Sequence, residues 1–170
     1  KAYLRRAQIL MALDLKNEAR KTYQEFDHLF GKSSGNLGIS VFRAQTLMDD
    51  NRYEEALELL RSVAEERRLD QTFPRQAAYL QGVCQQKLKK VDAAIFYFER
   101  TAKNFEDSHE GLAANISLAG LLHQEGRSEE AFLAYQRALS LVQRTEDYRN
   151  QWLSIEDLRK LILDARNKWI

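Results

Sequence analysis

The sequence predicts an all-α fold built from repeated helix pairs, and three observations support this. The 170 residues include only seven glycines and one proline, too few for the many tight turns that a β-rich fold needs. A pattern of small and large residues recurs at a nearly constant interval. Within each copy of this pattern, apolar residues follow helical spacing. The composition, 44% hydrophobic and 30% charged, is typical of a globular chain and not of a disordered one.

Four alanines anchor the repeat. Successive anchors are 37, 38 and 37 residues apart, and they are Ala19, Ala56, Ala94 and Ala131. Twelve residues before each anchor stands a small residue: Ala7, Ala44, Gly82 and Ala119. Four residues after each anchor stands a large one: Tyr23, Leu60, Phe98 and Tyr135. Small residues let two helices cross closely, while a large side chain fills the adjacent hollow.

The anchors divide residues 1–142 into four repeats, at about 1–36, 37–72, 73–108 and 109–142. Each repeat is predicted to form two helices, because two apolar stripes are separated by a break such as Gly126. Ser128 is placed to cap the second helix of repeat four, with Glu130 in its first turn. In repeat two, Asn51 followed by Glu54 predicts a similar cap.

Residues 143–170 are predicted to form a separate C-terminal capping helix. Apolar residues there follow spacings of three and four, namely Ile155, Leu158, Ile162, Ala165 and Trp169. A repeat array needs such a helix, with one apolar and one polar face, to cover its last pair. The alternative is that this helix docks another chain, or a second copy, through Trp152 and Trp169.

The small–large pattern resembles the tetratricopeptide repeat in all four copies. This resemblance implies a right-handed α-α superhelix of four helix pairs. The glycine that the family usually has before the second helix is present only as Gly126, and Asp14, Asn51 and Lys89 replace it elsewhere. The family's aromatic residue at the head of the first helix is matched only by Tyr3, with Ser40, Ala78 and Asn115 in the later copies. The period also exceeds the usual 34 residues.

Repeats one and three end in similar linkers. Phe30 and Phe105 each lie eleven residues after their anchor, and Ser33 and Ser108 follow three residues later, where each is predicted to cap the next helix. This arrangement is similar to that in tetratricopeptide proteins of the bacterial cell envelope, although Pro usually follows the aromatic residue there.

No constellation of residues predicts catalysis, so we expect no enzyme, no cofactor and no metal site. Cys84 stands among apolar residues and is expected to be a buried thiol. The three histidines are scattered and lack ligand spacing. The Gly-Lys-Ser at 31–33 ends like a phosphate-binding loop, but Phe26 occupies the place of the required leading glycine.

Charge and hydropathy exclude two further classes of partner. With 26 Lys+Arg against 25 Asp+Glu and no basic stripe, the sequence predicts no nucleic-acid binding. The longest apolar run, from Ala93 to Phe98, is far too short to insert in a membrane. The chain starts at Lys1 inside a predicted helix, so we expect a fragment of a longer protein. Its single cysteine fits either the cytoplasm or the bacterial periplasm.

The resemblance implies that the first helix of each repeat lines a concave groove that binds a protein or peptide. The expected groove residues are apolar, aromatic or able to hydrogen-bond a peptide backbone, and they are Arg5, Gln8, Met11, Phe42, Gln45, Met48, Tyr79, Val83, Gln86 and His123. The implied function is that of a non-catalytic interaction scaffold within a larger assembly. The alternative is a peptide-sensing regulatory domain whose curvature changes when a ligand binds.

Overall fold

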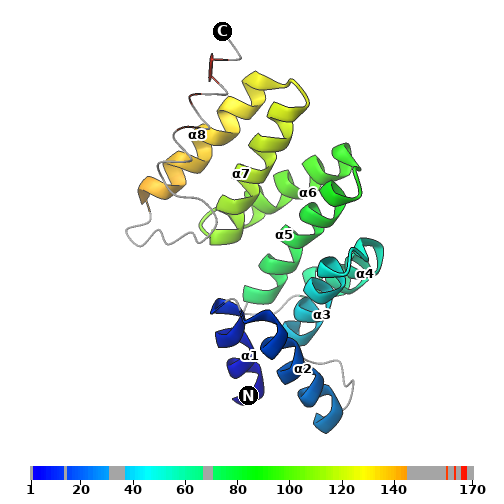
Figure 1. Ribbon diagram of the computed structural model, residues 1–170. Helices are drawn as coiled ribbons and strands as arrows, with labels where there is room; N and C mark the ends of the chain where they lie inside the picture. The colour runs from blue at the N-terminus through cyan, green and yellow to red at the C-terminus, as the bar shows by residue number, and fades with distance from the viewer. Residues whose placement is uncertain are drawn as a thin grey trace. The chain divides into compact units, whose positions relative to one another are not determined.

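The computed structural model of the protein describes residues 2–13, 15–30, 37–66 and 71–144, together with the single positions 160, 163, 166 and 167 (Figure 1). Within these residues it contains eight α-helices and no strand, which confirms the predicted fold class. The helices are α1 (Ala2–Ala12), α2 (Lys16–Phe30), α3 (Leu37–Asp49), α4 (Tyr53–Ala64), α5 (Thr72–Lys87), α6 (Val91–Asn104), α7 (His109–Gln124) and α8 (Ser128–Arg144). Beyond Arg144, the predicted capping helix lies outside the described residues except at those four positions.

The chain divides into two compact units, residues 1–74 and 75–170. In the first unit α1 packs against α2, and α3 packs against α4. In the second unit α7 packs against both α6 and α8. The pairs α1/α2, α3/α4 and α7/α8 therefore form hairpins of the kind that the repeat predicts.

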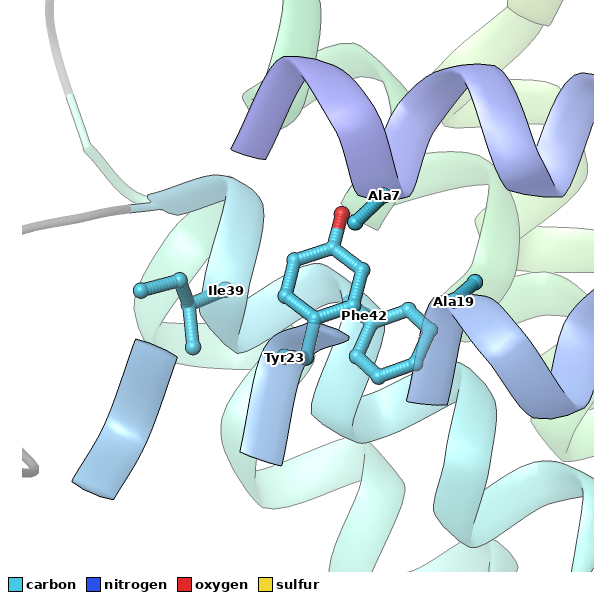
Figure 2. Packing of buried hydrophobic residues seen from close by; sticks show 5 residues of the cluster. All are labelled: Ala7, Ala19, Tyr23, Ile39 and Phe42. Carbon is cyan, nitrogen blue, oxygen red and sulfur yellow. The ribbon is translucent and has the colours of Figure 1, made fainter. Parts of the chain in front are cut away.

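The small residues that define the repeat all lie in helix crossings. All four anchor alanines are 0% exposed, and so are Ala7, Ala44 and Ala119. The four large residues that follow the anchors are buried as well. In the first unit the side chains of Ala7 and Ala19 lie beside the rings of Tyr23 and Phe42 (Figure 2). The alternation of small and large residues therefore determines how the helices pack in the core.

Replacing the anchor Ala131 with leucine is expected to lower the free energy of unfolding by about 1–3 kcal/mol, because three extra carbons must enter a filled crossing. Ala131 is 0% exposed on α8. Chemical denaturation followed by circular dichroism measures this change. A neutral result would show that the crossing does not require a small residue.

The turn between the two helices of a repeat has the same geometry three times. Asn51, Lys89 and Gly126 have φ values of 60°, 58° and 76°, in the left-handed region. Each of these residues donates its backbone N–H to a carbonyl three residues earlier. The residue after each of them donates to a carbonyl five residues earlier, as in Arg52 N–H to Leu47 O at 2.8 Å. This is a Schellman-type helix end. It forms with asparagine and lysine in the place where the family usually has glycine.

One predicted helix cap is confirmed. Ser108 precedes α7, and its Oγ accepts a hydrogen bond from the Gly111 N–H at 3.0 Å. A serine oxygen here satisfies one of the free N–H groups of the first turn.

The caps predicted at Asn51 and Ser128 are wrong, for one shared reason. The left-handed residue closes the preceding helix, so the next residue becomes the N-cap, as Arg52 does for α4. Arg52 makes no side-chain cap and instead donates its Nε to Glu55 at 2.6 Å. Ser128 is already the first residue of α8, and Arg127 before it pairs in the same way with Glu130.

Candidate functional site

The predicted groove residues take two different positions on the first helices. Those at the later positions are half-buried, namely Gln45, Met48, Val83, Gln86 and His123. Those nearer the helix start differ, because Phe42 and Tyr79 are buried whereas Arg5 is exposed. The side chains of Gln8 and Met11 lie outside the described residues.

In the first unit, Phe42 takes part in the packing between α2 and α3. Its ring stacks on Tyr23 with a centroid distance of 3.6 Å and an interplanar angle of 19° (Figure 2). Burial raises the pKa of Tyr23 to about 12, so the phenol is neutral at ordinary pH. Both rings also line a cavity of about 300 Å³ that Thr46, Leu47 and other residues of α2, α3 and α4 complete. Gln45 and Met48 remain half-buried on α3.

In the second unit, two polar contacts tie α5 to α7. Arg75 Nε lies 3.6 Å from Glu110 Oε2, near the start of both helices. Further along, the Tyr79 hydroxyl and the Ser117 hydroxyl are hydrogen-bonded at 3.2 Å. Burial raises the pKa of Tyr79, and the hydrogen bond with Ser117 opposes this shift. Because both contacts join residues on first helices, they hold α5 and α7 side by side and parallel.

Beyond these contacts lies the α5/α7 surface, defined by Val83, Gln86, Gly120 and His123. These residues follow Tyr79 and Ser117 at steps of three and four along the two helices, and all four are half-buried. A Cβ at Gly120 would meet only the Tyr135 hydroxyl oxygen, at 3.7 Å. The lack of a side chain there therefore leaves open space at the surface.

The α5/α7 surface offers hydrogen bonds and apolar contact. The Gln86 amide both donates and accepts, and the His123 imidazole does so in its neutral form. Val83 adds apolar area beside them. Because a peptide backbone has one donor and one acceptor per residue, this set of groups suits recognition of a polypeptide segment.

Other kinds of site lack support among the described residues. No group of three or more His, Cys, Asp or Glu side chains there is placed to hold a metal ion. Cys84 is buried, as predicted. The Gly-Lys-Ser at 31–33 lies outside the described ranges. None of the helices in those ranges has the length and apolarity that a membrane crossing requires.

The second unit also contains a cavity that the sequence analysis missed. It measures about 420 Å³ and lies between α6 and α8, with α7 as its floor. Asn115 on that floor is buried, and its Nδ2 donates to the Gly111 carbonyl at 3.1 Å. Asn115 stands where the family usually has an aromatic ring, so a shorter side chain leaves space. That substitution was the signal that could have indicated the cavity.

Comparisons with known proteins agree with this architecture. The family model of the tetratricopeptide repeat matches residues 1–33 and 76–108. The fold is similar to that of a structure named MamA AMB-1, with a TM-score of 0.62 and 12% identity over 99% of this chain and 81% of that chain. A second structure, a crystal structure of MamA protein, has a TM-score of 0.58 and 18% identity over 99% of this chain and 86% of that chain. No curated protein matches the sequence. The chain therefore contains tetratricopeptide repeats within residues 1–33 and 76–108, and its fold is similar to that of both MamA structures.

Proposed function

We propose that this protein is a non-catalytic scaffold that binds a peptide or protein segment along its first helices, within a larger assembly. Tetratricopeptide repeats are in general protein–protein interaction modules, and this supports the broad role. The α5/α7 surface supports the finer one, because it presents half-buried amide, imidazole and apolar groups on two helices that are joined by hydrogen bonding.

Preorganisation is the physical basis of this proposal. The Arg75–Glu110 and Tyr79–Ser117 contacts hold α5 and α7 in place before any segment binds. A bound segment then loses its own freedom but does not have to order the surface that it meets. Gln45 and Met48 occupy the equivalent positions on α3, where a flexible thioether adds adaptable apolar contact.

The test starts from a displayed peptide library selected on the 170-residue chain. Binding of the selected peptides is then measured by fluorescence anisotropy, with Gln86→Glu/His123→Glu as the variant. We expect affinity to fall about tenfold or more, because a carboxylate lacks the amide's donor and costs more to desolvate. The equivalent variant in the first unit is Gln45→Glu/Met48→Glu.

The matched control is Gln136→Glu, which makes the same chemical change at an exposed position on α8. It should leave both peptide affinity and the helical circular dichroism unchanged. Selected peptides that bind the first-helix variants as tightly as the wild type would place the binding site elsewhere.

The regulatory alternative predicts a different experimental result. A peptide-sensing domain whose curvature responds to its ligand should change its radius of gyration when a selected peptide is added. Small-angle X-ray scattering with and without that peptide separates the two roles, since a scaffold should keep its dimensions.

A further inference from the structure

The second helices of repeats three and four carry the same exposed triplet. Relative to the anchor alanine, an acidic residue lies two positions before, a large apolar residue two positions after and an arginine six positions after. The triplets are Asp92, Phe96 and Arg100 on α6, and Glu129, Leu133 and Arg137 on α8. Steps of four residues place each triplet on one helical stripe about 12 Å long.

The fold does not require apolar residues in these stripes. Phe96 is 56% exposed and Leu133 is 47% exposed, and the four charged members are exposed as well. At the same positions repeats one and two carry only exposed polar residues, namely Asn17, Lys21 and Glu25 on α2, and Glu54, Glu58 and Ser62 on α4. A single exposed apolar residue is ordinary. The recurrence of an exposed apolar residue with the same flanking charges indicates a functional surface.

The two helices that carry the stripes border one cavity. The cavity between α6 and α8 is lined by Glu99 and Lys103 from one helix and by Arg137 from the other. At the acidic ends, the hydrogen bond from Arg127 to Glu130 raises the pKa of that arginine, and the charges of Glu99 and Asp92 add to the shift. Together the stripes form one face, called here the α6/α8 face.

The charges of the α6/α8 face complement those of the same face turned end to end. Both helices place their acid toward the N-terminus and their arginine toward the C-terminus. A second copy can be related to the first by a two-fold axis that lies in the plane of the face and runs perpendicular to both helices. This axis would place Asp92 opposite Arg100 of the second copy. The same axis would set Glu129 against Arg137 and bring each apolar residue onto its equivalent. A parallel arrangement would instead oppose like charges.

We propose that the α6/α8 face is a self-association surface, on which a second copy of this chain docks antiparallel. A symmetric pair of this kind is the commonest closed oligomer, because one patch serves both partners. The face is small beside the roughly 1,200 Å² of a stable interface, so the dimer is weak and forms at high concentration. Charge complementarity sets its register, and burial of the four apolar side chains drives it.

The first experiment is analytical ultracentrifugation of the 170-residue chain over a concentration series. The wild type is expected to approach twice the monomer mass, whereas Phe96→Ser/Leu133→Ser should stay monomeric at concentrations about tenfold higher. The matched control is Leu13→Ser/Leu29→Ser, which removes two leucines of 63% and 58% exposure from the first unit. It should dimerise like the wild type. A monomeric wild type, or an apolar variant that still dimerises, overturns the proposal.

The second experiment tests the antiparallel register. Asp92→Arg/Glu129→Arg makes both stripes basic, and Arg100→Asp/Arg137→Asp makes both acidic. Each variant alone should be monomeric because like charges then face each other, while an equimolar mixture should form a heterodimer. Circular dichroism checks that both variants stay folded. A mixture that stays monomeric, or variants that each dimerise alone, would show that these charges do not pair.

Discussion

Replacing Gly111 with alanine is expected to destabilise the protein by about 3 kcal/mol, the upper end of the usual cost of overpacking. A Cβ at this position would overlap the Phe105 carbonyl oxygen and lie 2.7 Å from the carbonyl carbon. Both atoms belong to the backbone of the tight turn between α6 and α7. No side-chain rotation relieves the clash, so the turn itself must move away from the start of α7.

The same turn carries the Ser108 cap, and this increases the expected effect. Ser108 Oγ donates to the Phe105 carbonyl at 2.7 Å and accepts from the Gly111 N–H at 3.0 Å. A shift of the Phe105 carbonyl therefore disturbs both hydrogen bonds. Loss of a serine cap alone costs about 1 kcal/mol.

Gly120→Ala is the matched control, since it makes the same substitution in the same helix. Its Cβ would make only an ordinary contact with the Tyr135 hydroxyl. Alanine also favours a helix interior over glycine by about 1 kcal/mol. We expect this variant to be neutral or slightly more stable in urea denaturation. Equal losses at both positions would contradict the role given to the close approach at Gly111.

Replacing Phe98 with alanine is expected to cost about 3–5 kcal/mol, the typical penalty for truncating a buried aromatic side chain. Phe98 is 0% exposed and belongs to the largest fully buried side chains among the described residues. Its ring centroid lies 5.9 Å from that of Tyr79. The truncation leaves a cavity where α5 and α6 cross, and Tyr79 loses a packing partner.

Phe96→Ala is the control for this prediction, because it removes the same side chain two positions away on the exposed side of α6. Its cost, measured by the same denaturation at low concentration, should stay within about 0.5 kcal/mol. A loss as large as that of Phe98→Ala would show that truncating an aromatic side chain on α6 lowers the free energy of unfolding whether or not that side chain is buried.

A double-mutant cycle with Gly82 checks the reason for the effect. A Cβ at Gly82 would lie 2.6 Å from two atoms of the Phe98 ring. Gly82→Ala should therefore destabilise the wild type but be tolerated once the ring is gone. The two changes should couple by about 1 kcal/mol or more. Additive losses would mean that glycine and ring do not compete for the same space.

Much of the fold could be predicted because side-chain size alone encodes the helix crossings. The spacing of Ala19, Ala56, Ala94 and Ala131 indicated the repeat, and the burial of all four follows from it. The helix caps could not be predicted in the same way. Whether Asn51 caps α4 or closes α3 depends on a backbone angle that its residue type allows in either role.

The candidate site was predictable only in part, for a similar reason. Phe42 and Gln45 are close in sequence on the same helix, yet one is buried and the other half-buried. Position along a first helix decides whether a neighbouring helix covers a side chain, and the stacking of Tyr23 on Phe42 depends on that packing. The open space at Gly120 likewise depends on where Tyr135 comes to lie.

The shared turn geometry at Asn51, Lys89 and Gly126 has a practical consequence. Since three unlike residues support the same hydrogen bonds, and all three are exposed, backbone geometry and not side-chain chemistry maintains this bend. The exposed side chain of Lys89 is therefore a natural attachment point for a fluorophore or an affinity handle. A probe there would monitor the array without entering its core.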